Sequence, residues 1–416
     1  MRVSRRALGL AASGACIALG LAYYRNGEAD SYSAKPLLAL PTASFDESQV
    51  RDRDIAFYSQ RLAEDSTSAL DRSALARLLF ARARSTGSSR DLDRAELLAR
   101  ESIAERTQRN YGAFELLASV LMTRHEFKSA REVAIRLDSL NPGTPAHIAL
   151  LGEIELELGE YESAAARFDA VNYDGRNFTT AARLARWHEL TGRAARARSI
   201  LARTIREVNL REDLPREQVA WFHYRLGDLE LRLGNVAAAE SVFVRGLALN
   251  PGDVRVLGGL ARTALARGEW VEAIDFGEQA MVDRLEPSIL TTLSIAYTEL
   301  GDTAQASGYA RAMSVSERDK SGVSHREWGL FLLDHGSDRD RAEVLRHARR
   351  ELRDRQDIYG HDLMAWASYR NGNFDDARKH MKLALAHGTE DVMLARHARV
   401  ISAQNSVLAD STAKNE

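Results

Sequence analysis

Apolar residues along most of this chain recur every three or four positions, in short segments with polar residues between them. In one such segment the apolar positions are Leu226, Leu229 and Leu233, a spacing that places three side chains on one face of an α-helix. Gly234 follows, as expected where a helix ends in the left-handed conformation that glycine tolerates best. A second helix is predicted from Val236 to Leu249. The pattern therefore predicts a helical hairpin.

The same pattern recurs along the chain at intervals close to 34 residues. Each copy has a small residue, a glycine seven positions later, and an alanine in the following helix. The glycines are Gly159, Gly192, Gly234, Gly268, Gly301, Gly336 and Gly372. The alanines are Ala130, Ala164, Ala197, Ala239, Ala273, Ala306, Ala342 and Ala377. Since one hairpin cannot bury its apolar face alone, a repeat of this length predicts an array of stacked hairpins.

These markers resemble the tetratricopeptide repeat, a helix–turn–helix unit of 34 residues. The resemblance implies an all-α, right-handed superhelical solenoid. The turn of an additional N-terminal copy, 68–107, is expected to be stretched across Thr86–Asp93. Insertions are expected at Tyr173–Asn177 and Asn209–Arg216, with an extra residue in the turn Ser337–Asp340. The eight matching segments are 111–142, 145–172, 178–206, 220–251, 254–285, 287–313, 322–350 and 358–388.

The first residues differ in kind from the repeats. Arg2, Arg5 and Arg6 precede an uncharged run from Ala7 to Tyr24, and 18 residues is close to the length that spans a bilayer. The basic residues predict a cytoplasmic N-terminus, with the repeats on the other side of a bacterial-type inner membrane. The run is a retained signal anchor or a cleaved signal peptide, and the alternative to both is a buried N-terminal helix of a cytosolic protein. Ser4–Leu8 also resembles a twin-arginine export signal, although an ordinary basic segment gives the same pattern.

The remaining segment boundaries are placed where the helical periodicity begins or ends. Residues 25–50 have no helical period and are expected to form a tether. The final apolar segment is expected to cap the exposed end of the array, before a polar tail. The expected organisation is a signal segment (1–24), a flexible tether (25–50), a capping helix with the weak first repeat (51–110), the repeat solenoid (111–388), a C-terminal capping helix (389–404) and a disordered tail (405–416).

Composition narrows the classes of function. With 45% hydrophobic and 28% charged residues, the chain is typical of folded helical proteins rather than disordered ones. A formal net charge of −2 gives no general attraction to nucleic acid. The single cysteine, Cys16, excludes an intramolecular disulfide. Arginines at 193–206 and 346–355 form local basic clusters, which are either solvated helix faces or contacts for a partner.

Motifs for catalysis or cofactor binding are missing from the sequence. There is no glycine-rich phosphate loop, no His-Glu-x-x-His, no nucleophile elbow and no paired-cysteine metal motif. His361, His380, His387 and His397 have spacings that match no common set of metal ligands. We therefore predict no catalytic residues, no cofactor, no metal site and no nucleic-acid partner.

The resemblance implies that a partner binds on the concave face, which the first helix of each repeat lines. Aromatic residues and arginines are the side chains that most often anchor interfaces. However, the alternating charges of Glu153, Arg186, Asp228 and Arg262 are equally compatible with a structural ladder of salt bridges. The predicted partner-binding residues are Arg186, Glu189, Trp221, Tyr224, Asp228, Arg262, Thr298, Trp366 and Tyr369.

The sequence thus predicts a non-catalytic scaffold that binds a protein or peptide in a concave groove outside the cytoplasm. One alternative is an envelope protein that binds a polymer or glycan in a groove lined by Trp and Tyr. A second alternative is an enzyme whose substrate occupies the groove. The identity of the partner and the oligomeric state are not encoded in these patterns.

Overall fold

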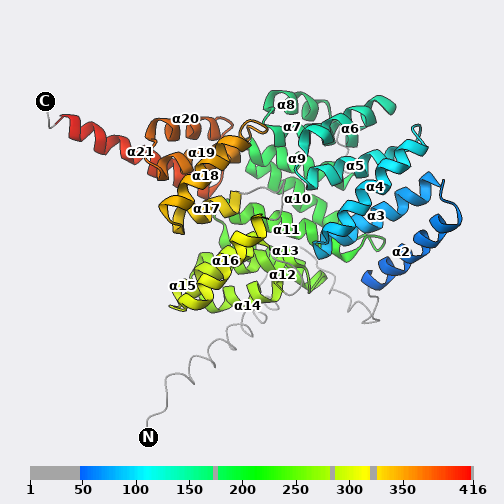
Figure 1. Cartoon of the computed structure of the whole chain (residues 1–416), viewed down its shortest axis with the longest axis horizontal. Coiled ribbons are helices and arrows are strands. Elements are labelled where there is room, and N and C mark those ends of the chain that lie inside the picture. Colours follow the sequence, from blue (N-terminus) through cyan, green and yellow to red (C-terminus); the bar gives the residue numbers. More distant parts are fainter. Residues whose placement is uncertain (1–46, 172–176, 282–285, 319–325, 414–416) are drawn as a thin grey trace, which may run out of the picture. The chain divides into compact units, whose positions relative to one another are not determined.

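The computed structural model describes residues 47–171, 177–281, 286–318 and 326–413. Within them the chain forms 20 helices and no strand, so the predicted all-α class is confirmed (Figure 1). No helix in these ranges is both long enough and apolar enough to cross a bilayer. The predicted signal segment and most of the predicted tether fall in residues 1–46, outside the described residues.

The helices form consecutive antiparallel pairs, as the periodicity predicted. Helix α2 (Glu47–Glu64) precedes the pairs and α21 (Val392–Ala413) follows them. The pairs are α3 (Ala69–Thr86) with α4 (Ser89–Glu105), α5 (Tyr111–Thr123) with α6 (Phe127–Leu140), α7 (Pro145–Leu158) with α8 (Tyr161–Ala170), α9 (Phe178–Leu190) with α10 (Ala194–Val208), α11 (Arg216–Arg232) with α12 (Val236–Leu249), α13 (Val254–Arg267) with α14 (Trp270–Ala280), α15 (Pro287–Glu299) with α16 (Thr303–Arg318), α17 (Arg326–His335) with α18 (Asp338–Glu351), and α19 (Ile358–Arg370) with α20 (Phe374–Ala384).

The marker residues pack as small residues should. A Cβ on Gly227 would lie 2.5 Å from the ring of Phe243, and one on Gly152 would lie 2.8 Å from the ring of Phe168. The marker alanine of α12, Ala239, has no exposed surface. These positions bring the two helices of a repeat close enough to enclose an aromatic ring.

Six of the seven predicted turn glycines have φ between 67° and 83°, the left-handed range. The prediction is wrong at Gly336, which is not among the left-handed glycines. Here Ser337 caps α18 in a capping box with Asp340, so the extra turn residue replaces the usual glycine turn. The register shifts with it, since Ala342 is only half-buried while Val344 is fully buried.

The two ends of the array differ from the predicted boundaries. The first repeat is complete rather than stretched, because Gly87 (φ 72°) ends α3 and the side chain of Ser88 caps α4 at once. The helix α21 continues to Ala413, beyond residue 404, where a disordered tail was expected. No glycine or proline interrupts the sequence between Gly388 and that point.

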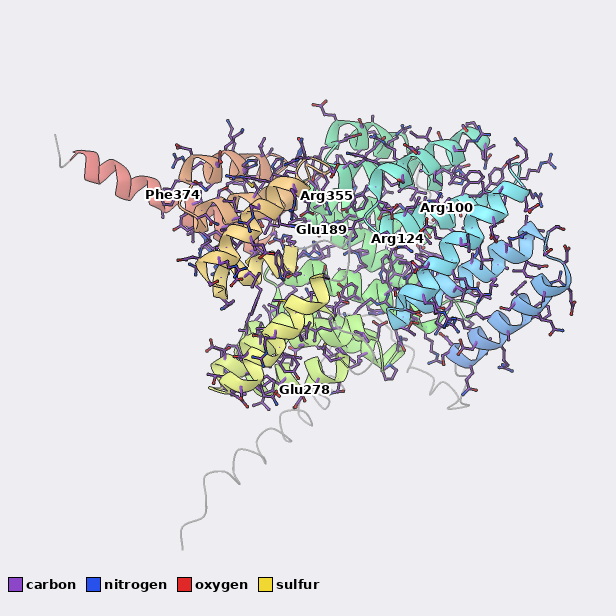
Figure 2. All side chains as sticks on the ribbon, viewed as in Figure 1. Arg100, Arg124, Glu189, Glu278, Arg355 and Phe374 are labelled. Atoms are coloured by element: carbon purple, nitrogen blue, oxygen red, sulfur yellow. The ribbon has the colours of Figure 1, made fainter. Side chains whose placement is uncertain are left out.

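Ion pairs supplement the apolar core along the surface. Arg124, at the end of α5, approaches Glu96 of α4 at 2.9 Å, and Arg100 approaches the same carboxylate at 2.8 Å. Figure 2 labels both arginines. Such exposed pairs contribute little individually. The stacking of neighbouring helices is therefore chiefly apolar.

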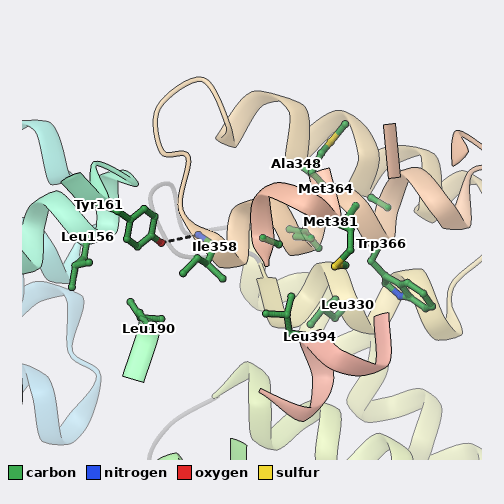
Figure 3. Close-up of a cluster of buried hydrophobic side chains, with 14 of the residues drawn as sticks. Leu156, Tyr161, Leu190, Leu330, Ala348, Ile358, Met364, Trp366, Met381 and Leu394 are labelled. Carbon is green, nitrogen blue, oxygen red and sulfur yellow. Dashed lines mark hydrogen bonds between the residues drawn. The ribbon is translucent and has the colours of Figure 1, made fainter. Parts of the chain in front are cut away.

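One contact was not predicted from the repeat pattern. Residues from α7–α9 and from α17–α21 belong to a single buried hydrophobic cluster, although more than a hundred positions separate them in the sequence. The hydroxyl of Tyr161 accepts a hydrogen bond from the Ile358 N–H at 2.9 Å (Figure 3). A solenoid is expected to bury each repeat only against its neighbours. This long-range contact positions the site described next.

Candidate functional site

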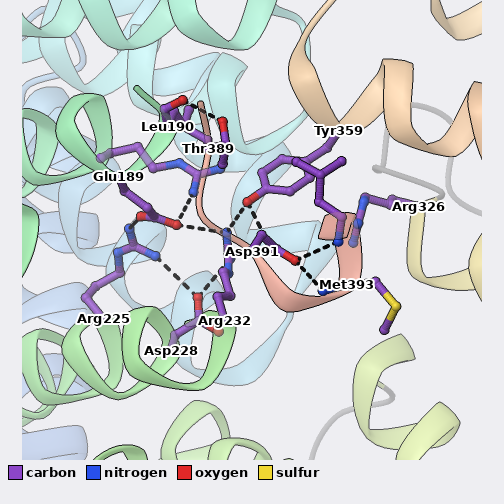
Figure 4. Close-up of polar contacts among 12 residues, drawn as sticks. Glu189, Leu190, Arg225, Asp228, Arg232, Arg326, Tyr359, Thr389, Asp391 and Met393 are labelled. Carbon is purple, nitrogen blue, oxygen red and sulfur yellow. Dashed lines mark hydrogen bonds and ion pairs between the residues drawn. The ribbon is translucent and has the colours of Figure 1, made fainter. Parts of the chain in front are cut away.

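Charged side chains from three successive first helices meet in one network. In α9, Arg186 lies 2.7 Å from Glu189, which in turn contacts Arg232 of α11 at 3.0 Å. Asp228 contacts Arg232 at 2.8 Å and Arg262 of α13 at 3.1 Å. Figure 4 shows most of these contacts. We call this network the ladder, and it consists of Arg186, Glu189, Arg225, Asp228, Arg232 and Arg262.

The carboxylates of the ladder are buried, and only the arginines reach the surface. Glu189 is 3% exposed and Asp228 is 1% exposed. Burial alone would raise the pKa of both carboxyl groups, but the surrounding arginines outweigh it and hold both pKa values below their usual range. The two groups are therefore ionised at neutral pH, and the alternating charges do form a salt-bridge ladder.

The C-terminal repeats cover one side of the ladder. Arg232 donates a hydrogen bond to the hydroxyl of Tyr359 at 3.2 Å, and that hydroxyl donates to Asp391 at 3.3 Å. The guanidinium groups of Arg186 and Arg326 lie 5.6 Å and 4.7 Å from the centre of the Tyr359 ring, within cation–π range. Burial raises the pKa of Tyr359, so its hydroxyl remains a donor.

Two other predicted residues belong to a separate cluster. Trp366 is 3% exposed and donates its indole N–H to Asp334 at 2.9 Å. The ring of Tyr369 stacks on the indole of Trp366, with the ring centres 5.2 Å apart. His397 stacks on the same indole at 4.4 Å and contacts the buried carboxylate of Asp362 at 2.8 Å.

The remaining predicted residues are distributed along the array. Trp221 packs edge-on against Phe222 at 4.9 Å and is half-buried. Thr298 is exposed, and its hydroxyl donates to the carbonyl of Ser294 within its own helix. Tyr224 is half-buried beside the ladder. The nine predicted residues thus form the ladder, a second cluster around Trp366 and isolated positions, rather than one groove.

Glu153, which the sequence placed in the same charge series, is not part of the ladder. Its partner is Arg183 at 2.7 Å, one turn before Arg186 in α9. Sequence reasoning missed Tyr359, Asp362 and Asp391, which complete the polar contacts of the C-terminal repeats. The repeat pattern carries no signal for them, because it describes neighbouring repeats only.

Two cavities lie away from the ladder. One, of about 410 Å³, lies between the start of α6 and α18 and includes Phe127, Lys128, His347 and Arg355 in its lining. The other, of about 430 Å³, is lined by Val171, Leu184, His188, Arg196, Ser199, Ile200 and Arg203. Burial, together with Arg193 and Arg196, lowers the pKa of His188 to about 4. Within the described ranges, no group of three or more His, Cys, Asp or Glu side chains is arranged to hold a metal ion.

The fold and the ladder define a helical-repeat protein whose successive first helices share one face. Residues 224–284 match the model of the tetratricopeptide repeat, over α11 to α14. The predicted resemblance is confirmed for this segment, which carries tetratricopeptide repeats.

Several solved structures are similar to the chain. PilW, a type IV pilus biogenesis factor, is 18% identical, with a TM-score of 0.41 over 50% of this chain and 94% of that chain. PilF of Pseudomonas aeruginosa is 17% identical, with a TM-score of 0.40 over 54% and 97%. Human IFIT1 is 14% identical, with a TM-score of 0.45 over 82% and 95%. No curated protein matches the chain.

Proposed function

We propose that this protein is a non-catalytic scaffold that binds a protein or peptide on the inner face of its repeats, beside the ladder. Tyr224 and Arg262 carry the proposal, because they lie on neighbouring first helices and keep part of their surface exposed. The side chain of Arg262 is 28% exposed and is already held by Asp228. A ring and a guanidinium fixed before binding lose little conformational freedom on contact with a partner.

The test is affinity capture of the full-length protein, followed by capture with Tyr224→Ala and Arg262→Ala. Each substitution should weaken binding of the same partner by about tenfold or more, as expected for an interface anchor. In the Arg262→Ala variant, Asp228 still has Arg225 and Arg232 as ion-pair partners, so the fold should persist. Arg245→Ala is the matched control, since Arg245 hydrogen-bonds to Ser241 of its own helix and is not a member of the ladder. Unchanged binding in both variants would reject this surface.

The protein acts on the outer side of a bacterial-type inner membrane in this proposal. The support is the sequence before the described residues, in which Arg2, Arg5 and Arg6 precede the uncharged run Ala7–Tyr24. Protease added to spheroplasts should digest the repeats. Recovery of the protein only from the cytosolic fraction would contradict the proposed location.

Peptide or protein binding is favoured over glycan binding by the placement of the aromatic rings. A sugar stacks on an exposed aromatic face, whereas Trp366 is buried between Tyr369 and His397. Trp221 is half-buried against Phe222. The exposed edge of the ladder combines the guanidinium of Arg262 with the half-buried ring of Tyr224, which suits a polypeptide.

A further inference from the structure

The turn glycines of three successive repeats are contacted by a distant part of the chain. A Cβ on Gly159 would lie 2.4 Å from the backbone of Gln356, and one on Gly192 would lie 2.6 Å from the carbonyl of Gly388. A Cβ on Gly234 would lie 3.0 Å from Val392. The equivalent position at Gly301 has no such neighbour within 4 Å. The turns after α7, α9 and α11 therefore form a row of contacts with residues 356, 388 and 392.

Hydrogen bonds accompany two of these glycine contacts. The Gln356 N–H donates to the carbonyl of Leu158 at 3.0 Å, and the hydroxyl of Thr389 donates to the carbonyl of Leu190 at 2.6 Å. Both carbonyls belong to the last turns of first helices, where backbone acceptors lack partners within the helix. The docked segment thus satisfies groups that water or a capping residue would otherwise satisfy.

Charged contacts flank these hydrogen bonds. Arg355 lies 3.1 Å from Glu157. The hydroxyl of Tyr359 accepts a hydrogen bond from Arg232 of the ladder and donates one to Asp391. We call this whole set of contacts the seam, and it joins residues 355–359 and 387–392 to the turns after α7, α9 and α11. The apolar part of the seam belongs to the single buried cluster described above and includes Tyr161, whose ring lies 4.0 Å from that of His387.

The segments on the far side of the seam belong to helices that bury apolar side chains against one another. Leu333 and Leu394 have no exposed surface, and Leu363 and Met381 are 1% and 4% exposed. These side chains come from α17, α19, α20 and α21, which we call the C-terminal arm together with α18. The printed hydrogen bonds and ion pairs of the seam are polar, and polar contacts between parts of a chain commonly allow one part to move relative to the other.

We propose that the C-terminal arm is an intramolecular occupant of the middle repeats, and that it separates from them along the seam as a folded unit. In the docked state Tyr359 of the arm contacts Arg232 and lies against Arg186, on one side of the ladder. Release of the arm uncovers this surface. The regulatory meaning of the release rests on the proposed function, because the arm contacts the same ladder that holds Arg262 of the proposed partner surface. The separation itself does not depend on that function.

Hydrogen exchange of the full-length protein tests the separation, with Gly192→Ala compared with Gly301→Ala. Both glycines are left-handed, at φ 67° and 80°, so both substitutions introduce the same backbone strain. Only the Cβ at 192 meets the arm. In Gly192→Ala, amides of residues 354–360 and 386–392 should exchange about tenfold faster than in the unmodified protein, while α19 and α20 keep their protection. In Gly301→Ala the same amides should be unchanged.

A second pair of variants removes a hydrogen bond without backbone strain. Thr389→Val deletes the bond to Leu190 across the seam, and Thr263→Val deletes a bond of the same length, 2.6 Å, inside α13. Only Thr389→Val should speed exchange at the seam. Equal effects of the two members of either pair would overturn the proposal, as would loss of protection of α19 and α20 together with the seam. If the seam opens but Tyr224→Ala and Arg262→Ala leave every partner bound, the proposed function fails and this inference stands.

Discussion

At the scale of the residue, Asp228 is the charged group most completely removed from water in the ladder. It directly follows the marker Gly227, so the close packing of α11 on α12 carries its carboxylate inward. Arg225, Arg232 and Arg262 surround it. A buried charge is tolerated when it is paired in this way, and the loss of one member leaves the others without compensation.

Replacing Asp228 by Ala should therefore destabilise the fold strongly. Three arginines would lose their shared carboxylate, and we expect a loss of about 3 kcal/mol in the free energy of unfolding. Denaturant unfolding followed by circular dichroism measures it. Asp275→Ala, at an exposed position of α14, is the control and should stay within about 0.5 kcal/mol of the unmodified protein. Similar stability of the two variants would show that the ladder contributes nothing net.

The buried position of His223 leads to a prediction about the stability of the fold at acid pH. Burial, and to a smaller extent Arg245, lowers its pKa to about 4, while an unfolded histidine titrates near 6.5. The unfolded state therefore binds the proton first, so the stability that neutral His223 contributes is present above pH 6.5 and is lost as the pH falls towards 4. Between these values the unmodified protein should lose up to about 3 kcal/mol more than His223→Gln. Thermal unfolding across this pH range measures the difference, and parallel pH curves would contradict it.

At the scale of the element, the helices and their turns follow from local sequence. The apolar spacing and the small–Gly–Ala markers predicted both helices of each repeat from α5 to α20, because these residues act within one hairpin or between neighbours. Where the turn chemistry differed, the prediction failed: Ser337 with Asp340 replaces the glycine turn at Gly336. The ladder could be anticipated from alternating charges, since Arg186, Asp228 and Arg262 lie on adjacent first helices.

Glycine has two different roles inside these helices, and substitution by alanine separates them. Gly227→Ala should destabilise the protein, because its Cβ would lie 2.5 Å from the ring of Phe243 in a closely packed hairpin. Gly308→Ala, in α16, meets no atom within 4 Å and should stabilise the protein by up to about 1 kcal/mol through helix propensity. Melting temperatures of the two variants should move in opposite directions. A shared direction would mean that the marker position is not fixed by packing.

At the scale of the whole molecule, the return of the arm onto the middle repeats could not be predicted. The contact between Arg355 and Glu157 joins residues 198 positions apart. Neither residue is unusual in its own repeat, and the periodic pattern specifies only how each hairpin meets the next. For the same reason the contacts of Tyr359 and Asp391 could not be predicted from the sequence, although they complete the ladder that was predicted from the first helices.

A double-mutant cycle between Arg355→Met and Glu157→Gln tests this long-range contact. The pair is largely removed from solvent, with side chains 13% and 25% exposed, so it should be coupled by about 1 kcal/mol. Unfolding free energies of the single and double variants give the coupling. The pair Arg349 and Asp376, which is about half exposed on both sides, is the control and should show a smaller value. Additive effects for Arg355 and Glu157 would show that the two parts of the chain are energetically independent there.

The position of the arm after the middle repeats in the sequence also determines when the seam forms. Repeats fold as they leave the ribosome, starting from the N-terminus, whereas contacts across 197 to 199 positions must wait for the last helices to be made. Every newly made copy therefore passes through a period in which α7–α12 are folded and their inner face is uncovered. Under the proposed function, a partner present during synthesis meets that face before the arm docks, whereas a partner that arrives afterwards meets the ladder with Tyr359 already in place.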